Sequence, residues 1–203
     1  MANQTKYNQI LDALQTLLAK KNIQTISVSE IAQTAGIGKG SIYYYFPSKS
    51  AILEALIERS YQPSLMTAHQ LAQQKDISPF TRMAQIFQAC RDSSRDFLSK
   101  DSQVSPLDER ERSFLHQKYL HHLITELKPD LTEIICQGVE RGEIHFDYPS
   151  ALTEMVLIVL TVKIDNTLLP SSREEIEDTI QGLISLLEKG TGNPSGSLNF
   201  LKV

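Results

Sequence analysis

The residues of this sequence best suited to chemistry lie between Gly36 and Lys49, in the stretch GIGKGSIYYYFPSK. Lysines, serines and three consecutive tyrosines supply hydrogen-bond donors, and three glycines leave the backbone bare. Ammonium and hydroxyl groups can donate to phosphate oxygens or base edges, and glycine lets a backbone approach its ligand closely. The stretch therefore predicts a surface that binds a large anion.

Short helices are expected to position these residues. Ser27–Glu30 has the S-x-x-E form of a capping box, so a helix should begin there and stop near Gly36. The next helix should start near Gly38 or Lys39 and end before Pro47. Two short helices separated by a tight turn have helix-turn-helix geometry, in which the second lies in the DNA major groove.

Helical phase sorts the side chains of that second helix. Ile42 and Tyr45 should face the core, and Tyr43 and Tyr44 should project toward the duplex. Lys49 opens the following helix, where a cation opposes the helix dipole, and a nearby phosphate would explain it. Two further residues can reach base edges: Lys39 and Ser41.

The motif I-A-x-x-A-G-I-G-K-G-S-I-Y-Y-Y-F-P-S-K, followed by an apolar helix, resembles the N-terminal signature of the TetR family of bacterial transcription regulators. The resemblance covers about the first 60 residues. It implies a homodimer that binds double-stranded DNA and pairs through its last two helices. It also implies phosphate contacts from Ser27, Val28, Tyr43 and Lys49, and base contacts from Lys39, Gly40, Ser41 and Tyr44.

Charge is distributed unevenly along the 203 residues. The formal net charge is −4, yet residues 1–62 carry six basic and four acidic side chains, a balance of +2. The positive part contains the motif, which suits a polyanionic partner. The N-terminus lacks an apolar signal region, and the longest apolar run, Met155–Val162, is too short to span a membrane, so we expect a cytoplasmic protein.

Helical periodicity dominates the remainder, so the predicted fold is all-α with about nine helices. We expect a helix-turn-helix DNA-binding domain at 1–62, a larger helical-bundle effector-binding and dimerisation domain at 63–190, and a flexible tail at 191–203 rich in glycine, proline and serine. Pro129 is expected to open the seventh helix.

The eighth expected helix carries LTEMVLIVLTVKI, which is apolar nearly all round. Packing against its own domain on one side and a symmetry mate on the other would bury both faces, which favours a C2 dimer. A central helix in a monomeric bundle is the alternative. In a dimer, two recognition helices roughly 34–36 Å apart would meet successive major grooves of a palindromic operator.

The larger domain is expected to bind a small effector that controls operator affinity, and the resemblance implies repression relieved by that ligand. The expected pocket residues come from the fifth to eighth helices: Phe87, Phe114 and Tyr119. A protein partner in place of the small molecule is one alternative, and core packing of these three side chains is another.

No enzyme chemistry is predicted. The sequence has no Ser/His/Asp, Cys/His or paired-carboxylate arrangement with suitable spacing and no phosphate loop, so a helical-bundle enzyme is the last of the alternatives. His116, His121 and His122 are poorly spaced for a shared metal, and we predict neither metal nor cofactor. Cys90 and Cys136 form no CxxC pair, and Cys90 is expected in the core.

Overall fold

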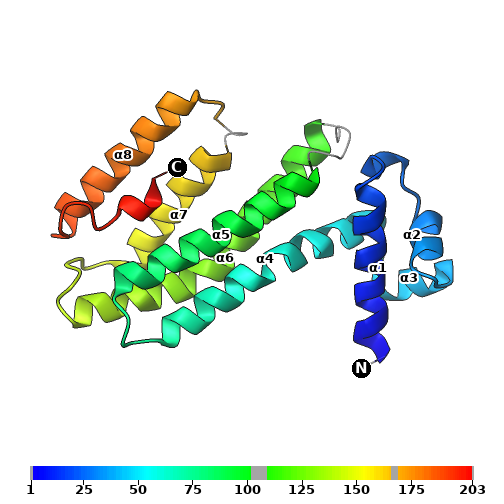
Figure 1. Ribbon diagram of the computed structural model, residues 1–203, viewed down its shortest axis with the longest axis horizontal. Coiled ribbons are helices and arrows are strands. Elements are labelled where there is room, and N and C mark those ends of the chain that lie inside the picture. The colour runs from blue at the N-terminus through cyan, green and yellow to red at the C-terminus, as the bar shows by residue number, and fades with distance from the viewer. Residues whose placement is uncertain (1, 102–108, 166–168, 203) are drawn as a thin grey trace. The chain divides into compact units, whose positions relative to one another are not determined.

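The protein is built from helices joined by short links. The computed structural model describes residues 2–101, 109–165 and 169–202, with side chains placed in 4–93, 121–164 and 169–202. The described residues contain no strand, which confirms the predicted all-α class, and none of their helices is long and apolar enough to cross a bilayer. Figure 1 labels the α-helices: α1 (Ala2–Leu18), α2 (Val28–Thr34), α3 (Lys39–Tyr45), α4 (Lys49–Gln73), α5 (Pro79–Asp101), α6 (Glu109–Glu140), α7 (Pro149–Asp165) and α8 (Arg173–Gly190). Two 3₁₀ turns complete the described elements: η1 (Ile23–Thr25) and η2 (Asn199–Leu201).

The chain divides into two compact units. The first comprises Met1–Gln62 and Asp92–Tyr119, and the second comprises Pro63–Arg91 and Leu120–Val203. Helix α4 contributes to both, because the division falls inside the helix and Pro63 does not end it.

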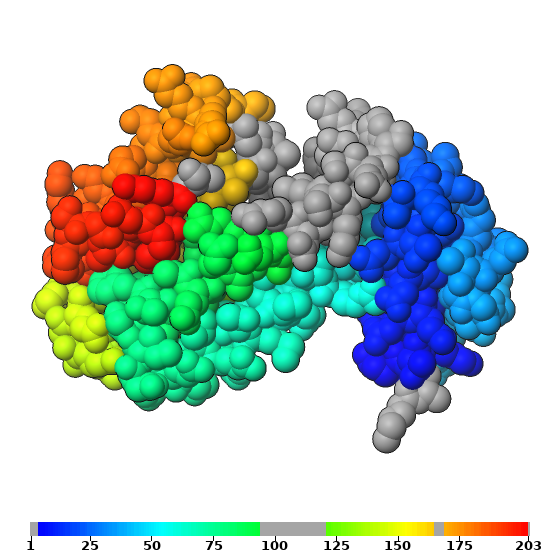
Figure 2. All heavy atoms as spheres, viewed as in Figure 1, coloured from blue at the N-terminus to red at the C-terminus, as the bar shows by residue number. Residues whose placement is uncertain are grey.

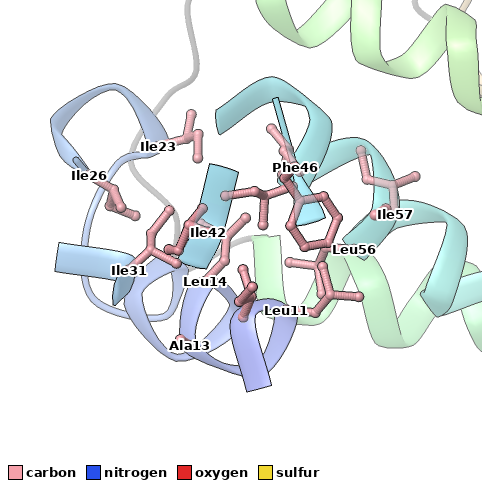
Figure 3. Close-up of a cluster of buried hydrophobic side chains, with 14 of the residues drawn as sticks. Leu11, Ala13, Leu14, Ile23, Ile26, Ile31, Ile42, Phe46, Leu56 and Ile57 are labelled. Carbon is pink, nitrogen blue, oxygen red and sulfur yellow. The ribbon is translucent and has the colours of Figure 1, made fainter. Parts of the chain in front are cut away.

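One apolar cluster holds α1 to α4 together within the first unit. Helices α2 and α3 have seven residues each, too few to be stable alone in water. Each buried leucine or isoleucine contributes about 1.5–3 kcal/mol, so the shared core stabilises what local propensity cannot. Figure 3 shows the cluster, which includes Leu11, Leu14, Ile23, Ile26, Ile31, Ile42, Phe46, Leu56 and Ile57.

Helix α6 differs from the prediction, because it runs through Pro129 where a new helix was expected to open. The eight described α-helices therefore replace the nine expected. A proline inside a helix removes one hydrogen bond and costs about 3 kcal/mol. Leu127, Ile134 and Ile135 are buried on either side of it, and their burial offsets that cost.

The segment after α8 is not the loose tail that its composition predicts. Leu198 and Leu201 are buried, in one cluster with α7 and α8 residues such as Leu160 and Ile180. In Figure 2 the segment, drawn in red, lies against the green surface of α5. Composition could not predict this docking, because it depends on three apolar side chains in and beside η2: Leu198, Phe200 and Leu201.

Candidate nucleic-acid interface

Helix α3 is anchored on one side and exposed on the other. Ile42 is 1% exposed in the core cluster, and Phe46, which follows the helix, is also buried. Tyr45 lies half-buried against the same cluster. Tyr43 and Tyr44 instead face solvent, with 51% and 77% of their surfaces exposed. The core holds α3 firmly, yet two large rings of the helix lie in solvent. Exposed rings on an anchored helix are typical of a surface that binds a partner.

The first turn of α3 completes this surface. Lys39 and Gly40 are exposed and Ser41 is half-exposed. The Tyr44 ring packs edge-on against Tyr45, with 5.1 Å between ring centroids, so the half-buried tyrosine supports the exposed one. The structure thus brings the predicted base-contacting residues together on one short helix, and their contacts with bases stay a prediction.

The turn between α2 and α3 depends on Gly36. Its φ of 67° lies in the left-handed region, which side chains rarely adopt. The Ile37 N–H donates to Ala32 O (3.0 Å) and the Gly36 N–H donates to Gln33 O (3.2 Å), which is the Schellman pattern. This confirms the predicted stop of the helix and sets the direction in which α3 leaves the turn.

Gly40 has no such backbone requirement. It lies inside α3, and a Cβ atom added there would meet nothing within 4 Å. Glycine weakens a helix by about 0.5–1 kcal/mol relative to alanine. Nothing in the described free chain offsets that cost, which favours the predicted close approach to a ligand at this position.

The start of α2 is fixed by the predicted capping box, which the structure confirms. The Ser27 N–H donates to Glu30 Oε2 (2.8 Å), and the Glu30 N–H donates to Ser27 Oγ (3.2 Å). Lys21 Nζ lies 2.7 Å from Glu30 Oε1. The hydrogen bond from Lys21, followed by those from Ser27, lowers the pKa of Glu30 to about 2. The Lys21 ammonium also offsets the carboxylate charge beside the predicted phosphate contacts at Ser27 and Val28.

Lys49, the first residue of α4, contacts the link between α1 and α2, residues 19–27. Its ammonium donates to the carbonyl oxygens of Ile23 (2.7 Å), Ile26 (3.0 Å) and, at longer range, Gln24 (3.4 Å). The structure gives Lys49 an intramolecular role that sequence reasoning missed, and its contact with a phosphate stays a prediction. No local signal could have found it, because 23 to 26 residues separate the partners.

Only one of the predicted effector-pocket residues lies among the described side chains. Phe87 is half-buried on α5, with the Phe200 ring edge-on to it at 6.3 Å between centroids. The Arg91 guanidinium stands 4.8 Å from the centre of the Phe87 ring. Phe114 and Tyr119 lie outside the described side chains, so the shared pocket of the three residues stays a prediction.

Arg82 on α5 is a buried charge that sequence reasoning also missed. Its Nη1 donates to Gln137 Oε1 on α6 (2.6 Å) and to Leu71 O near the end of α4 (3.3 Å). Gln137 Nε2 in turn donates to Ala72 O (3.1 Å), so the pair donates to two carbonyls in the last turn of α4. Burial lowers the pKa of Arg82. Its position four residues before the buried Ile86 was the available signal.

The side chains that the structure places contain no group of three histidine, cysteine or acidic residues that could hold a metal ion. His121 is exposed and His122 half-buried, and His116 lies outside the described side chains. Burial raises the pKa of the Cys90 thiol to about 11, so this thiol is protonated at neutral pH.

Two family descriptions match the chain. Residues 10–56 match the family described as "Bacterial regulatory proteins, tetR family". Residues 97–184 match the family described as "Tetracyclin repressor-like, C-terminal domain". Together the two stretches cover well over half of the chain.

Curated relatives resemble the N-terminal part. The chain is 40% identical over 58 residues to the nucleoid occlusion factor SlmA of Haemophilus ducreyi, covering 28% of this chain and 29% of SlmA. It is 38% identical over 64 residues to the HTH-type transcriptional regulator EthR of Mycobacterium tuberculosis, covering 32% of this chain and 30% of EthR. The matches thus span less than a third of either relative's length.

Solved structures share the fold over nearly the whole chain. A TetR-family regulator from Mesorhizobium loti superposes with a TM-score of 0.63 at 15% identity, covering 94% of this chain and 98% of that one. SmeT, the repressor of the Stenotrophomonas maltophilia multidrug efflux pump SmeDEF, gives 0.62 at 16% identity, with 94% and 92% covered. RolR in complex with resorcinol gives 0.57 at 18% identity, with 99% and 96% covered. These similarities show the shared fold. The two family matches, with the geometry of α2 and α3, show that the chain belongs to the TetR family of bacterial transcriptional regulators.

Proposed function

We propose that the protein is a homodimeric repressor, not an enzyme, which binds a palindromic operator through α3 and is released by a small effector bound in its second unit. The observation that carries the proposal is the outer side of α3. Its two exposed tyrosines and its exposed first turn find no role in the core of the chain, whereas Ile42 fixes the helix firmly. Such a regulator would act in the cytoplasm.

The contacts divide by chemistry. Lys39, Gly40, Ser41 and Tyr44 meet base edges in the major groove, where ammonium and hydroxyl groups donate to guanine acceptors and a ring can pack on a thymine methyl. Three further residues, Ser27, Val28 and Tyr43, meet phosphates. The first amides of α2 lack helical partners, and the positive end of the helix dipole attracts anions. The balance of +2 over residues 1–62 supports this assignment.

The dimer forms through α7 and α8. Met155 and Ile158 of α7 are exposed apolar side chains three residues apart, and Leu186 of α8 is 70% exposed. Gly182, one turn before Leu186, has open space where a side chain would stand, so another helix can approach closely there. An isologous pairing of these two helices would remove the apolar side chains from water.

Effector binding belongs to the second unit. RolR was solved with resorcinol, and SmeT is named as a repressor of an efflux pump, so both neighbours support a small-molecule effector here. The effector must bind one dimer geometry more tightly than the other, because equal affinity for both shifts nothing.

The first test pairs two exposed tyrosines. Genomic fragments retained by the purified chain define an operator, and binding is then measured by fluorescence anisotropy. Tyr44→Ala should weaken operator binding by about 1–3 kcal/mol and lower the preference over random DNA. Tyr148→Ala, which removes a ring that is 70% exposed in the second unit, should leave both unchanged. Equal losses for the two variants would refute the assignment of α3.

The dimer is tested by light scattering. The wild type should show twice the 22.8 kDa mass of one chain, and Leu186→Glu should shift it toward the monomer. Met66→Glu changes a similarly exposed apolar residue of α4 and should keep the dimer. A Leu186→Glu variant that stays dimeric would place the interface elsewhere. The effector is tested separately, by screening small molecules for release of the operator. If every compound fails and a protein partner releases the operator, the alternative holds, in which the second unit binds a protein.

A further inference from the structure

Lys49 has an unusual environment for a residue expected to grip DNA. It opens α4, where the helix dipole is positive, and its side chain is half-buried. The Ser48 hydroxyl already caps this helix by accepting the Ala51 N–H (3.1 Å), so Lys49 is not needed to start it. What stabilises the cation is a group of carbonyl oxygens from the link between α1 and α2.

These carbonyls use the hydrogen-bonding capacity of the ammonium. A lysine has three N–H donors, and the oxygens of Ile23, Ile26 and Gln24 lie at 2.7, 3.0 and 3.4 Å from Nζ. To reach a phosphate, the ammonium would have to release at least one of them. The bonds to Ile23 and Ile26 are partly buried. The Ile23 oxygen also accepts the Ile26 N–H (3.2 Å), so the Ile26 oxygen is the acceptor for which loss of the ammonium is costly.

The link that Lys49 holds leads directly into α2. Ile23 and Ile26 insert their side chains into the core cluster, which fixes the link from the inside. Lys49 bonds to the backbone oxygens of the same two residues. Ser27 follows at once and caps α2. The position of the first turn of α2 therefore depends on the link, and the link is tied to α4 by one ammonium.

We propose that Lys49 is a positioning residue for DNA binding: its ammonium fixes the 23–26 link, and through it the start of α2, instead of contacting a phosphate. The proposal rests on the proposed function, because only a DNA-binding chain needs α2 in this place.

Lys49→Met separates the two roles, because it keeps an apolar stem of similar length and removes the ammonium. Hydrogen exchange of the free full-length chain is followed by mass spectrometry on peptides that cover 22–30. We expect exchange there to accelerate about tenfold, since the Thr25 and Ile26 amides bond within the link. Lys39→Met removes another lysine of the first unit and should leave this exchange unchanged.

Operator affinity is then measured against salt concentration. Lys49→Met should bind about tenfold more weakly, with the same slope of log affinity against log salt as the wild type. A slope smaller by about one would overturn the proposal, because it is the mark of a lost phosphate contact. Unchanged exchange in 22–30 would also overturn it. If Lys49→Met does not fold, Lys49→Gln is measured in the same way. A wild-type chain that binds no duplex at low salt would refute the proposed function, while the exchange result would still decide whether Lys49 holds the link.

Discussion

Replacing Gly40 with alanine should move stability and DNA binding in opposite directions. Gly40 lies inside α3 and the added methyl group meets nothing within 4 Å, so no steric cost arises in the free chain. Alanine favours the helix by about 0.5–1 kcal/mol. For a chain of this size, 1 kcal/mol of stability shifts the melting temperature by roughly 2–4 °C, so Gly40→Ala should melt roughly 1–4 °C higher than the wild type. The same methyl group would stand between α3 and the duplex, so we expect operator affinity to fall by about tenfold or more, which is about 1.4 kcal/mol.

The assay combines thermal unfolding of the free protein with anisotropy titration of the operator. Gly36→Ala is the matched control, because its Cβ atom would also have open space, yet φ there is 67°. A side chain in that conformation costs about 1–2 kcal/mol, so this variant should melt lower. Wild-type affinity in Gly40→Ala would refute close approach by α3. A lower melting temperature in Gly40→Ala would refute the reasoning about space and helix propensity.

Three further predictions test the contacts around the site and the packing of the second unit. The pKa of Glu30 is about 2 in the folded chain against an ordinary 4.5, so the stability from its carboxylate is present above pH 4.5 and is lost as pH falls toward 2; Glu30→Gln should melt lower than the wild type at pH 7, and the two melting temperatures should converge as pH falls through this range. Arg82→Ala should lower the free energy of unfolding by about 3 kcal/mol, because it leaves a cavity and removes the donor to Gln137 Oε1, whereas Leu71 O keeps the Gln74 N–H. A double-mutant cycle with Gln137→Ala should give a coupling of about 1 kcal/mol in denaturant titrations, and additive losses would show that the two side chains act separately. Leu201→Ala removes a buried anchor of the final segment, so chymotrypsin should cleave after Phe200 sooner than in the wild type, and equal cleavage rates would mean that the hydrogen bonds alone hold the segment.

Local signals account for the parts of the structure that sequence predicted well. The capping box of Ser27 and Glu30 and the turn at Gly36 each involve residues within five positions of one another. A second capping box of the same S-x-x-E form, between Ser172 and Glu175, starts α8. Such bonds depend on residue type and spacing, both of which are visible in a single sequence.

Long-range contacts account for the differences. Proline at 129 is a strong local stop signal, but burial of its helical neighbours outweighs it. Composition predicted a loose tail, whereas Arg91 Nη2 donates to Phe200 O (3.1 Å) across more than a hundred residues. The partners of Lys49 are likewise distant in sequence. Tertiary packing decided each case, and nothing in a local window encodes it.

Helix α4 determines where this chain can be cut to build a hybrid regulator, in which its N-terminal helices are fused to the C-terminal part of another protein. Ile52, Leu56, Ile57 and Tyr61 of this helix complete the core of the first unit. A graft that stopped at Pro47 would leave an open hydrophobic groove and an unstable fragment. Tyr61 is the last residue of this core cluster along the chain, so the splice belongs after it, inside the continuous helix α4. There a single inserted residue would rotate everything beyond the junction by about 100°, so the donor and recipient helices must be joined in register.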